Sequence, residues 1–260
     1  MFQPKRQSHS NPVNRLLTGI ISVSLVLLIG ASVGVASSSA FASSATPTPD
    51  VTIQPIPSPT PSLCGDCFNP NAFNLNQASS PWVVVNKQRP LNPINYAPTK
   101  FGSINLAEPA ASAFLKMKHE MYKTGFGILI LNSGYRSYQT QVGVHSKDVA
   151  KFGLQAGEIL AARPGYSEHQ TGLAADMSVQ GEGCPIKVCF AKTTGGKWLA
   201  ANSWRFGFIL RYPDGQTATT GYQFEPWHFR YVGVTLATEM KIKKISVLEN
   251  FWKLPAAPNY

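Results

Sequence analysis

The stretch from Ser167 to Asp176, Ser-Glu-His-Gln-Thr-Gly-Leu-Ala-Ala-Asp, constrains this chain more than any other feature. It carries two possible metal ligands, His169 and Asp176, with Gly172 between them and small residues just before the aspartate. Glycine lets a chain fold back sharply, so both side chains can point at one centre. Imidazole nitrogen and carboxylate oxygen are ligands that zinc accepts. The stretch is therefore predicted to form half of a zinc site.

The missing half is expected at Glu225-Pro226-Trp227-His228. Pro226 disfavours a helix, so this is not the helical His-Glu-x-x-His arrangement of common metalloproteases. In a strand Glu225 and His228 would point to opposite faces, so a turn at Pro226 is required. His169, Asp176 and His228 would leave one tetrahedral zinc position open for water, as catalytic sites do. Glu225 is then the candidate general base.

An arginine upstream is a candidate substrate anchor. Residues 127–132 form a short apolar run that predicts a buried strand, and Arg136 follows it just before a predicted helix at 138–152. A guanidinium there can hold a carboxylate through paired charge-assisted hydrogen bonds, although an ordinary salt bridge is an equal interpretation. On the helix, His145 lies on the apolar stripe and is expected to be a core histidine. Gln141 either joins Arg136 at a substrate or is a surface glutamine.

Other patterns complete the expected domain over residues 68–260. They are a strand or extended lead-in at 82–85, a core-facing helix beginning near Pro109 and ending before Gly125, a strand at 174–179, a helix at 197–204, a strand at 208–212, a polar loop at 213–220, and a helix at 234–244 followed by a short tail. His119 lies at the edge of an apolar stripe and is expected to be structural or exposed. Alternation in the 174–179 strand puts Ala174 and Asp176 on one face.

Residues 1–42 are expected to direct export. Lys5, Arg6 and Arg15 give a basic start, residues 16–36 form an apolar run, and Ala40-Phe41-Ala42 offers a small-residue cleavage site. The apolar run is long for a signal peptide, so an uncleaved membrane anchor is the alternative. In either case the remainder of the chain is predicted to be exported, to the periplasm or cell envelope.

Residues 43–67 are rich in Pro, Thr and Ser and are expected to form a linker, because they offer little apolar surface to bury. The formal net charge of the chain is +10, and removing the three basic residues of the first 42 leaves +7. A basic exported protein suits an anionic neighbour such as cell wall, whereas nucleic acid is not expected as a partner. Simple solubility explains the same charge equally well.

Four cysteines follow the apolar run: Cys64, Cys67, Cys184 and Cys189. In an oxidising compartment an even number predicts two disulfides, and the sequence allows three pairings. Local pairing, Cys64 with Cys67 and Cys184 with Cys189, is preferred because each pair closes a short loop. A structural zinc held by all four is the competing interpretation.

Three motifs together resemble a known family. Ser133-Gly134-Tyr135-Arg136-Ser137, the Ser-x-His-x-x-Gly-x-Ala-x-Asp stretch and Glu225-x-x-His228, in this order and spacing, are similar to the zinc D-alanyl-D-alanine carboxypeptidases of the VanY type. That family shares a fold group with lysostaphin-type peptidases and the hedgehog signalling domain. The resemblance spans roughly residues 74–231. It implies an α+β domain with a small antiparallel sheet that carries one zinc ion and is flanked by helices, and peptidoglycan stem peptides as substrate.

Transferred residue by residue, the resemblance makes His169, Asp176 and His228 the zinc ligands and Glu225 the catalytic base. Arg136, with Gln141 and Ser167, would hold the terminal carboxylate of the substrate. Trp227 and Tyr212 either line the pocket or stack in the core. The enzyme is expected to be a monomer.

The activity implied is removal of the terminal D-alanine from a D-Ala-D-Ala stem peptide. One alternative is an L,D-carboxypeptidase that acts on tetrapeptide stems. An endopeptidase fits less well, because an arginine placed for a free carboxylate favours an exo cut. The alternative from another class is a non-catalytic cell-wall-binding module of the same fold, but that would be signalled by a missing ligand or base, and none is missing.

Overall fold

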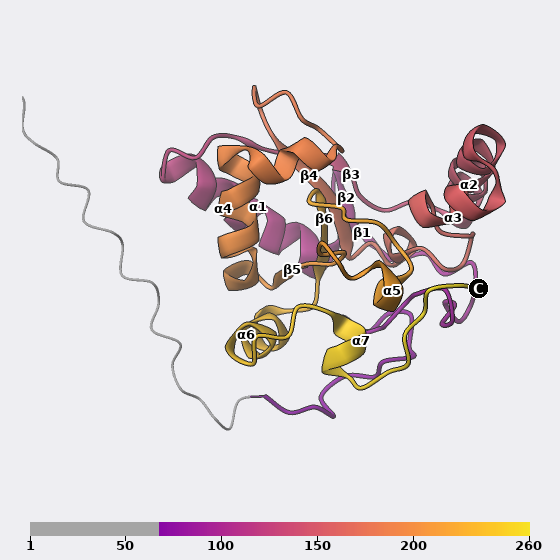
Figure 1. The fold of residues 1–260 in the computed structure, drawn as a ribbon. Helices are drawn as coiled ribbons and strands as arrows, with labels where there is room; N and C mark the ends of the chain where they lie inside the picture. The colour runs from indigo at the N-terminus through magenta and orange to yellow at the C-terminus, as the bar shows by residue number, and fades with distance from the viewer. Residues whose placement is uncertain (1–67) are drawn as a thin grey trace, which may run out of the picture. The chain divides into compact units, whose positions relative to one another are not determined.

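An antiparallel sheet of four strands, in the order β3-β4-β6-β5, lies at the centre of the computed structural model, which describes residues 68–260 (Figure 1). These residues fall within one compact unit. The strands are β3 (Leu129–Ser133), β4 (Ala174–Val179), β5 (Phe208–Leu210) and β6 (His228–Tyr231). A two-stranded sheet pairs β1 (Lys100–Phe101) with β2 (Ile104–Ala107). The predicted α+β class with a small antiparallel sheet is confirmed.

The two central strands bring distant parts of the sequence into register. Asp176 on β4 lies opposite His228 on β6, and Ser133 at the end of β3 lies opposite Asp176. Alternation then separates the two faces of the sheet. Met177 and Phe229 belong to the main hydrophobic core, so their neighbours Asp176 and His228 face the other way. The predicted strand at 174–179 and its facing are confirmed.

Seven α-helices and three 3-10 helices flank the sheet in the described part of the chain. The α-helices are α1 (Glu108–Lys123), α2 (Tyr138–Phe152), α3 (Leu154–Leu160), α4 (Thr194–Asn202), α5 (Thr217–Thr220), α6 (Val234–Ile242) and α7 (Leu248–Phe251). The 3-10 helices are η1 (Glu168–Thr171), η2 (Val188–Lys192) and η3 (Ser203–Phe206). The expected helix at 197–204 is therefore a slightly earlier α-helix completed by a 3-10 turn. The polar loop at 213–220 contains α5.

Helix α1 supplies one side of the main core. Pro109 lies in its first turn, where the missing N–H costs no hydrogen bond. Phe114, Met117 and Met121 are buried, and each contributes roughly 1.5–3 kcal/mol by leaving water. The helical spacing of the apolar residues predicts that Leu115 and Tyr122 also face the core, and this is wrong, because both are exposed. The helix buries the adjacent row of small residues and methionines instead, and His119 is exposed as expected.

The packing of helix α2 decides where Gln141 and His145 lie. The helix packs chiefly against α3, and Figure 1 shows this pair side by side at one edge of the unit. Gln141 is its one buried residue, which excludes the surface position that was one of the two alternatives for it. Its apolar stripe is only partly covered: Val142 and Val149 are half-buried, and Phe152 is exposed. His145 is therefore not a core residue but is half-buried, with Nε2 3.5 Å from Glu158 Oε1.

The segment at 82–85 forms no strand in the structure: Trp82 lies in a turn, and residues 83–85 have no regular secondary structure. It is nevertheless buried, because Trp82 belongs to a second apolar cluster with Val232 and Leu236 of the C-terminal region. The indole Nε1 of Trp82 donates to the carbonyl of Val232 at 2.8 Å. This hydrogen bond holds the N-terminal segment against the connection between strand β6 and helix α6.

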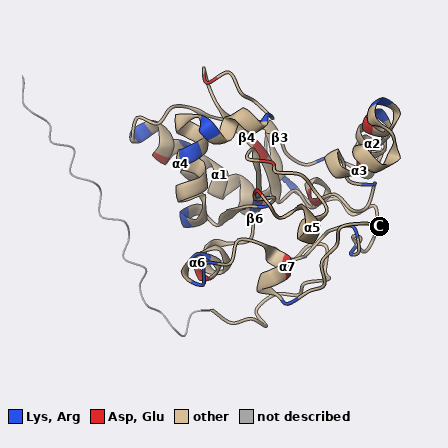
Figure 2. Cartoon of the chain, in the orientation of Figure 1, with Lys and Arg blue, Asp and Glu red and all other residues tan. Residues whose placement is uncertain are grey.

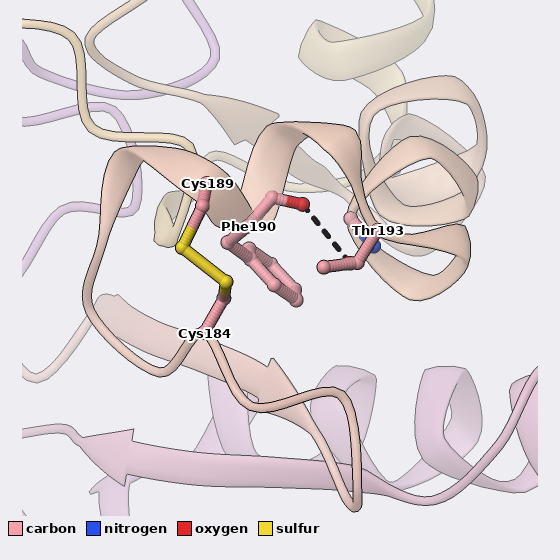
Figure 3. Close-up of a disulfide and its surroundings, with 5 residues drawn as sticks. Cys184, Cys189, Phe190 and Thr193 are labelled. Carbon is pink, nitrogen blue, oxygen red and sulfur yellow. Dashed lines mark hydrogen bonds between the residues drawn. A yellow bond between two sulfur atoms is a disulfide. The ribbon is translucent and has the colours of Figure 1, made fainter.

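Cys184 and Cys189 form a disulfide, which confirms their predicted local pairing and excludes a zinc held by these two (Figure 3).

The export segment, the linker, Cys64 and Cys67 lie outside the described residues. Within residues 68–260 no helix is both long and apolar enough to cross a membrane. In Figure 2, Lys and Arg positions lie on several helices, including α2, α4 and α6.

Candidate metal centre

His169, Asp176 and His228 converge on one point. They come from η1, β4 and β6, and one ligand atom from each lies within 4.8 Å of the others. The Nε2 atom of His169 lies 3.3 Å from Asp176 Oδ2, and the Nδ1 atom of His228 lies 3.2 Å from Asp176 Oδ1. All three side chains are buried. The structure thus brings together the three residues that the two sequence motifs predicted as ligands.

Two local features aim these side chains. Gly172 ends η1 with φ +70°, and a Cβ there would meet Pro98 Cγ at 2.8 Å and the Ala107 backbone nitrogen at 3.0 Å. Only glycine fits this fold-back into β4. On the other side, the His228 N–H donates to the Glu225 carbonyl at 3.0 Å, which closes the turn that the sequence required. As a result Glu225 Oε2 lies 3.7 Å from His228 Nδ1.

Each histidine ring is fixed by the nitrogen that faces away from the centre. The Nδ1 atom of His169 lies 2.6 Å from the Gly134 carbonyl oxygen, which leaves Nε2 toward Asp176. The Nε2 atom of His228 lies 3.4 Å from Glu168 Oε2, which leaves Nδ1 toward Asp176. Metal-binding histidines are usually held in this way by a carbonyl or carboxylate on the second nitrogen. The two rings are therefore oriented as ligands.

The charges of the centre also suit a cation. Burial and the nearby Arg136 lower the pKa of His169, so that imidazole is neutral. Burial alone would raise the pKa of Asp176, but His169 and His228 hold it well below its usual range. Its Oδ1 atom is buried and makes no hydrogen bond of acceptable geometry, despite the 3.2 Å approach of His228 Nδ1. A neutral imidazole and an under-satisfied carboxylate oxygen fit a bound zinc ion.

His228 behaves differently from His169. Burial would lower its pKa, but the Asp176 and Glu168 carboxylates raise the pKa to about 9 when no cation is bound. A zinc ion must therefore displace a proton from His228, since only a neutral imidazole can be a ligand. Zinc affinity should accordingly increase with pH.

Behind the centre lies a buried ionic network that sequence reasoning missed. Glu168 Oε1 accepts from Arg211 Nε at 2.8 Å and from Arg230 Nη1 at 2.9 Å. Arg211 also makes a bidentate pair with Glu249 on α7, at 2.9 and 2.7 Å. Burial opposes ionisation of Glu168, yet the two arginines hold its pKa well below the usual range. Arg211, a charged residue inside the predicted strand at 208–212, was the available signal.

A cavity of about 410 Å³ opens on the metal centre and is lined by the three candidate ligands together with Arg136, Ser167 and Glu225. Tyr212 and Trp227 line the cavity as well, and both are buried. Each of them therefore both lines the pocket and packs in the interior. A larger cavity elsewhere, about 620 Å³, is lined by none of these residues.

Arg136 is half-buried and faces this cavity, with no salt-bridge partner among residues 68–260. Its Nε atom is buried and makes no hydrogen bond to a described residue. Burial lowers the pKa of Arg136, and the charges of Asp176 and Glu225 only partly oppose this. A partly buried guanidinium with an unsatisfied donor is costly unless an anion completes it. The position is thus suited to bind a carboxylate.

The two other predicted substrate contacts differ in placement. Ser167 is buried at the start of η1 and lines the cavity. Gln141 is buried too but does not line the cavity; its Nε2 donates to the carbonyl of Ala162 at 2.8 Å. Ala162 itself is part of the lining, so Gln141 supports the wall from behind.

Glu225 is buried beside the candidate ligands. Burial raises the pKa of its carboxyl to about 8, although the positive charges of His228 and Arg136 oppose that rise. A bound cation would lower this value again, because an adjacent positive charge favours the carboxylate. A carboxyl that titrates near neutral pH is suited to accept and return a proton.

Comparison with known proteins is consistent with this geometry. The family model described as VanY, D-alanyl-D-alanine carboxypeptidase, matches residues 103–234, about half of the chain. YodJ of Bacillus subtilis (strain 168), whose name describes it as a carboxypeptidase, is 35% identical to this chain over 185 residues. These residues are 66% of this chain and 67% of YodJ. A D-alanyl-D-alanine carboxypeptidase of Enterococcus faecium is 36% identical over 149 residues, 57% of this chain but only 44% of that enzyme.

Solved structures agree. The LdcB LD-carboxypeptidase has a TM-score of 0.62 and 34% identity, covering 68% of this chain and 87% of LdcB. A mutant of the D,D-pentapeptidase VanY from a VanB-type resistance cassette was solved in complex with Zn(II). Its TM-score is 0.58 at 30% identity, and the match covers 65% of this chain and 97% of that chain. The expected zinc cofactor agrees with that complex and with the His169, Asp176 and His228 cluster. The chain belongs to the VanY family of D-alanyl-D-alanine carboxypeptidases.

Proposed function

We propose that the protein is a zinc-dependent carboxypeptidase that removes the terminal D-alanine from peptidoglycan stem peptides ending in D-Ala-D-Ala. One observation carries the proposal: the guanidinium of Arg136, half-buried and without an ion-pair partner among the described residues, faces the same cavity as Glu225 and the three candidate ligands. A cavity with a proton acceptor at its centre and an anion site at its wall suits a substrate that ends in a free carboxylate.

His169, Asp176 and His228 would hold the zinc ion. Zinc in such a site acts as a Lewis acid, which polarises the scissile carbonyl and makes a water molecule more acidic. Arg136, assisted by Ser167 on the same wall, binds the terminal carboxylate and fixes which peptide bond lies beside Glu225. Positioning of this kind supplies a large part of catalysis, because it converts an encounter into an intramolecular step.

Glu225 transfers the proton. Its carboxylate accepts a proton from the attacking water as the oxygen bonds to the carbonyl carbon. When the C–N bond breaks, the same carboxyl returns that proton to the leaving amine of D-alanine. Burial of Glu225 supports both steps, because it keeps the energies of the two protonation states close near neutral pH.

Purified protein loaded with zinc and incubated with pentapeptide and tetrapeptide stems tests the proposal. Mass spectrometry should show release of one D-alanine from the pentapeptide and none after chelation. The Glu225→Ala variant, prepared in parallel, controls for contaminating peptidases. Release from the tetrapeptide alone would overturn the D-Ala-D-Ala assignment.

The second candidate is an L,D-carboxypeptidase that acts on tetrapeptide stems. The likeness to the LdcB LD-carboxypeptidase favours it. The D-alanyl-D-alanine names of the family model and of the Enterococcus relatives favour the first candidate. The paired-substrate assay separates the two directly.

We further propose that the enzyme acts outside the cytoplasm, in the cell envelope, as a monomer. The basic start, the apolar run and the small-residue site within residues 1–42 support export. Mass determination of the protein recovered from the producing cells tests cleavage after Ala42. A full-length mass in the membrane fraction would favour the anchor, and light scattering would test the monomer.

A further inference from the structure

The disulfide Cys184–Cys189 closes a short loop whose base is firmly anchored. Phe190, next to the disulfide, is fully buried in the main core. The Thr193 hydroxyl donates to the Phe190 carbonyl at 3.0 Å (Figure 3). The Gly195 N–H donates to Glu182 Oε1 at 2.8 Å. These contacts fix both ends of the loop against the core. The residues between the cysteines are therefore held in place although they are exposed.

Ile186, within this loop, lines the same cavity as the candidate ligands, Arg136 and Glu225. The other described residues that line the cavity are buried or half-buried, whereas Ile186 is 46% exposed. It therefore marks the mouth of the cavity. Packing within the protein does not account for an isoleucine that keeps nearly half of its surface in water.

The backbone of Ile186 makes the choice of residue more unusual. Its φ is +50°, a left-handed conformation that β-branched side chains rarely adopt. Glycine or asparagine would fit that backbone with less strain. A strained backbone that carries a large apolar side chain at the mouth of a site points to a function for that side chain.

The geometry of an exopeptidase indicates what Ile186 meets. In the proposed function the free carboxylate binds inside, at Arg136, so the rest of the peptide must leave through the mouth. We infer that Ile186 is a specificity-determining residue that packs on the apolar surface of the stem peptide, on the N-terminal side of the scissile bond. This inference rests on the proposed function, and it assigns the Cys184–Cys189 loop to the substrate-binding wall.

The Ile186→Gly variant tests the inference, because glycine accepts φ +50° and removes only the side chain. Kinetics should compare a pentapeptide stem with N-acetyl-D-Ala-D-Ala, which lacks the residues that would reach the mouth. We expect KM for the pentapeptide to rise about 5- to 20-fold with kcat little changed, since burial of part of an isoleucine is lost. For the short substrate the change should stay below about twofold.

Val188 offers a matched control, since it lies in the same loop and is 52% exposed but does not line the cavity. Val188→Ala should leave both substrates unaffected. Zinc content and melting temperature should be measured for each variant. If Ile186→Gly lowers either, Ile186→Asn supplies the second test, because asparagine tolerates the left-handed region and is not apolar.

Equal KM values for the pentapeptide in the unaltered protein and in the well-folded variant would overturn the inference. An equal loss on both substrates would also overturn it, because the side chain would then act at the scissile bond. Failure of the unaltered, zinc-loaded protein to release D-alanine from either substrate would refute the proposed function itself.

Discussion

Two groups of buried charges lie on either side of the candidate ligands, and they differ in how they are paired. Behind His228, Glu168 and Glu249 are fully matched by Arg211 and Arg230, with hydrogen bonds of 2.7 to 2.9 Å. In the cavity, by contrast, the Arg136 Nε and Asp176 Oδ1 atoms are buried and have no hydrogen-bond partner within the described part of the chain. The first group is complete within the chain. The second group is completed only by something that binds.

This difference separates structural charges from functional ones. A buried charge with partners holds elements together: here the Glu168 network joins η1, β6 and α7 and orients a ligand ring. A buried charge without partners carries an energetic penalty in the free protein, and a ligand or substrate can remove that penalty. Variants in the two groups should therefore affect different measurements.

The largest effect is expected for Glu225→Ala. Loss of the proton carrier should reduce kcat by about 10²- to 10⁴-fold, while zinc content stays at one per chain. Stopped assays and metal analysis on the same sample provide the measurement. Glu239→Ala, a surface glutamate paired with Lys243, is the matched control and should keep full activity. Loss of zinc from Glu225→Ala would instead make Glu225 a ligand.

Glu168→Gln should act mainly on stability and metal affinity. It removes a buried negative charge from Arg211 and Arg230, which should cost about 3–5 kcal/mol in the free energy of unfolding. It also weakens the support of His228, so zinc affinity should fall about 10- to 100-fold.

Urea unfolding and competition with a chelator measure these two effects of Glu168→Gln. The control Glu239→Gln breaks an exposed pair and should cost less than about 1 kcal/mol. If Glu168→Gln proved as harmless as that control, the paired network would have no structural role.

Arg136→Met should reduce activity without reducing stability, the opposite of what is expected for Glu168→Gln. Without the guanidinium, kcat/KM should fall about 10- to 100-fold, as expected for the loss of charged hydrogen bonds to the terminal carboxylate. The free energy of unfolding should not decrease, because Arg136 makes no salt bridge to any of residues 68–260 and its Nε atom makes no hydrogen bond to them. A substrate with an amidated C-terminus provides the check: it should react poorly with the unaltered enzyme, and Arg136→Met should not distinguish it from the acid.

The smallest expected effect is a change in the pH dependence of unfolding of the chelated protein. Burial would raise the pKa of Glu249, but pairing with Arg211 lowers it below the ordinary value of 4.5. This contribution to stability is present above that value and is lost as the pH falls through the lowered pKa. Glu249→Gln should therefore be less stable at neutral pH and show a flatter acid limb in urea unfolding. An unchanged acid limb would contradict the pairing.

Glu225 should show the reverse sign in the same titration. Its pKa is raised to about 8, chiefly by burial, so its stabilising contribution is present below 4.5 and is lost as the pH rises toward 8. In the chelated protein, Glu225→Gln should therefore lose less stability than the unaltered chain between these values. Equal slopes would indicate that the carboxyl is not buried in solution.

The sequence by itself determined the types of ligand and the turns that aim them. Gly172 and Pro226 specify fold-back and turn through their own backbone limits, and the alternation of β4 puts Asp176 on the face opposite Met177. These are local properties, so they are readable from neighbouring residues. The candidate ligands His169, Asp176 and His228 followed from them because the chemistry of zinc restricts the choice.

Only the tertiary structure decided which charges are paired and which are left open. Glu168 meets Arg211 and Arg230 across 43 and 62 residues of sequence, and no local pattern encodes those partners. Gln141 reads as a surface residue on its helix, yet it is buried because the chain returns past it at Ala162. Ile186 reads as one apolar residue in a cysteine loop. Its position at the mouth of the cavity depends on where the core holds that loop.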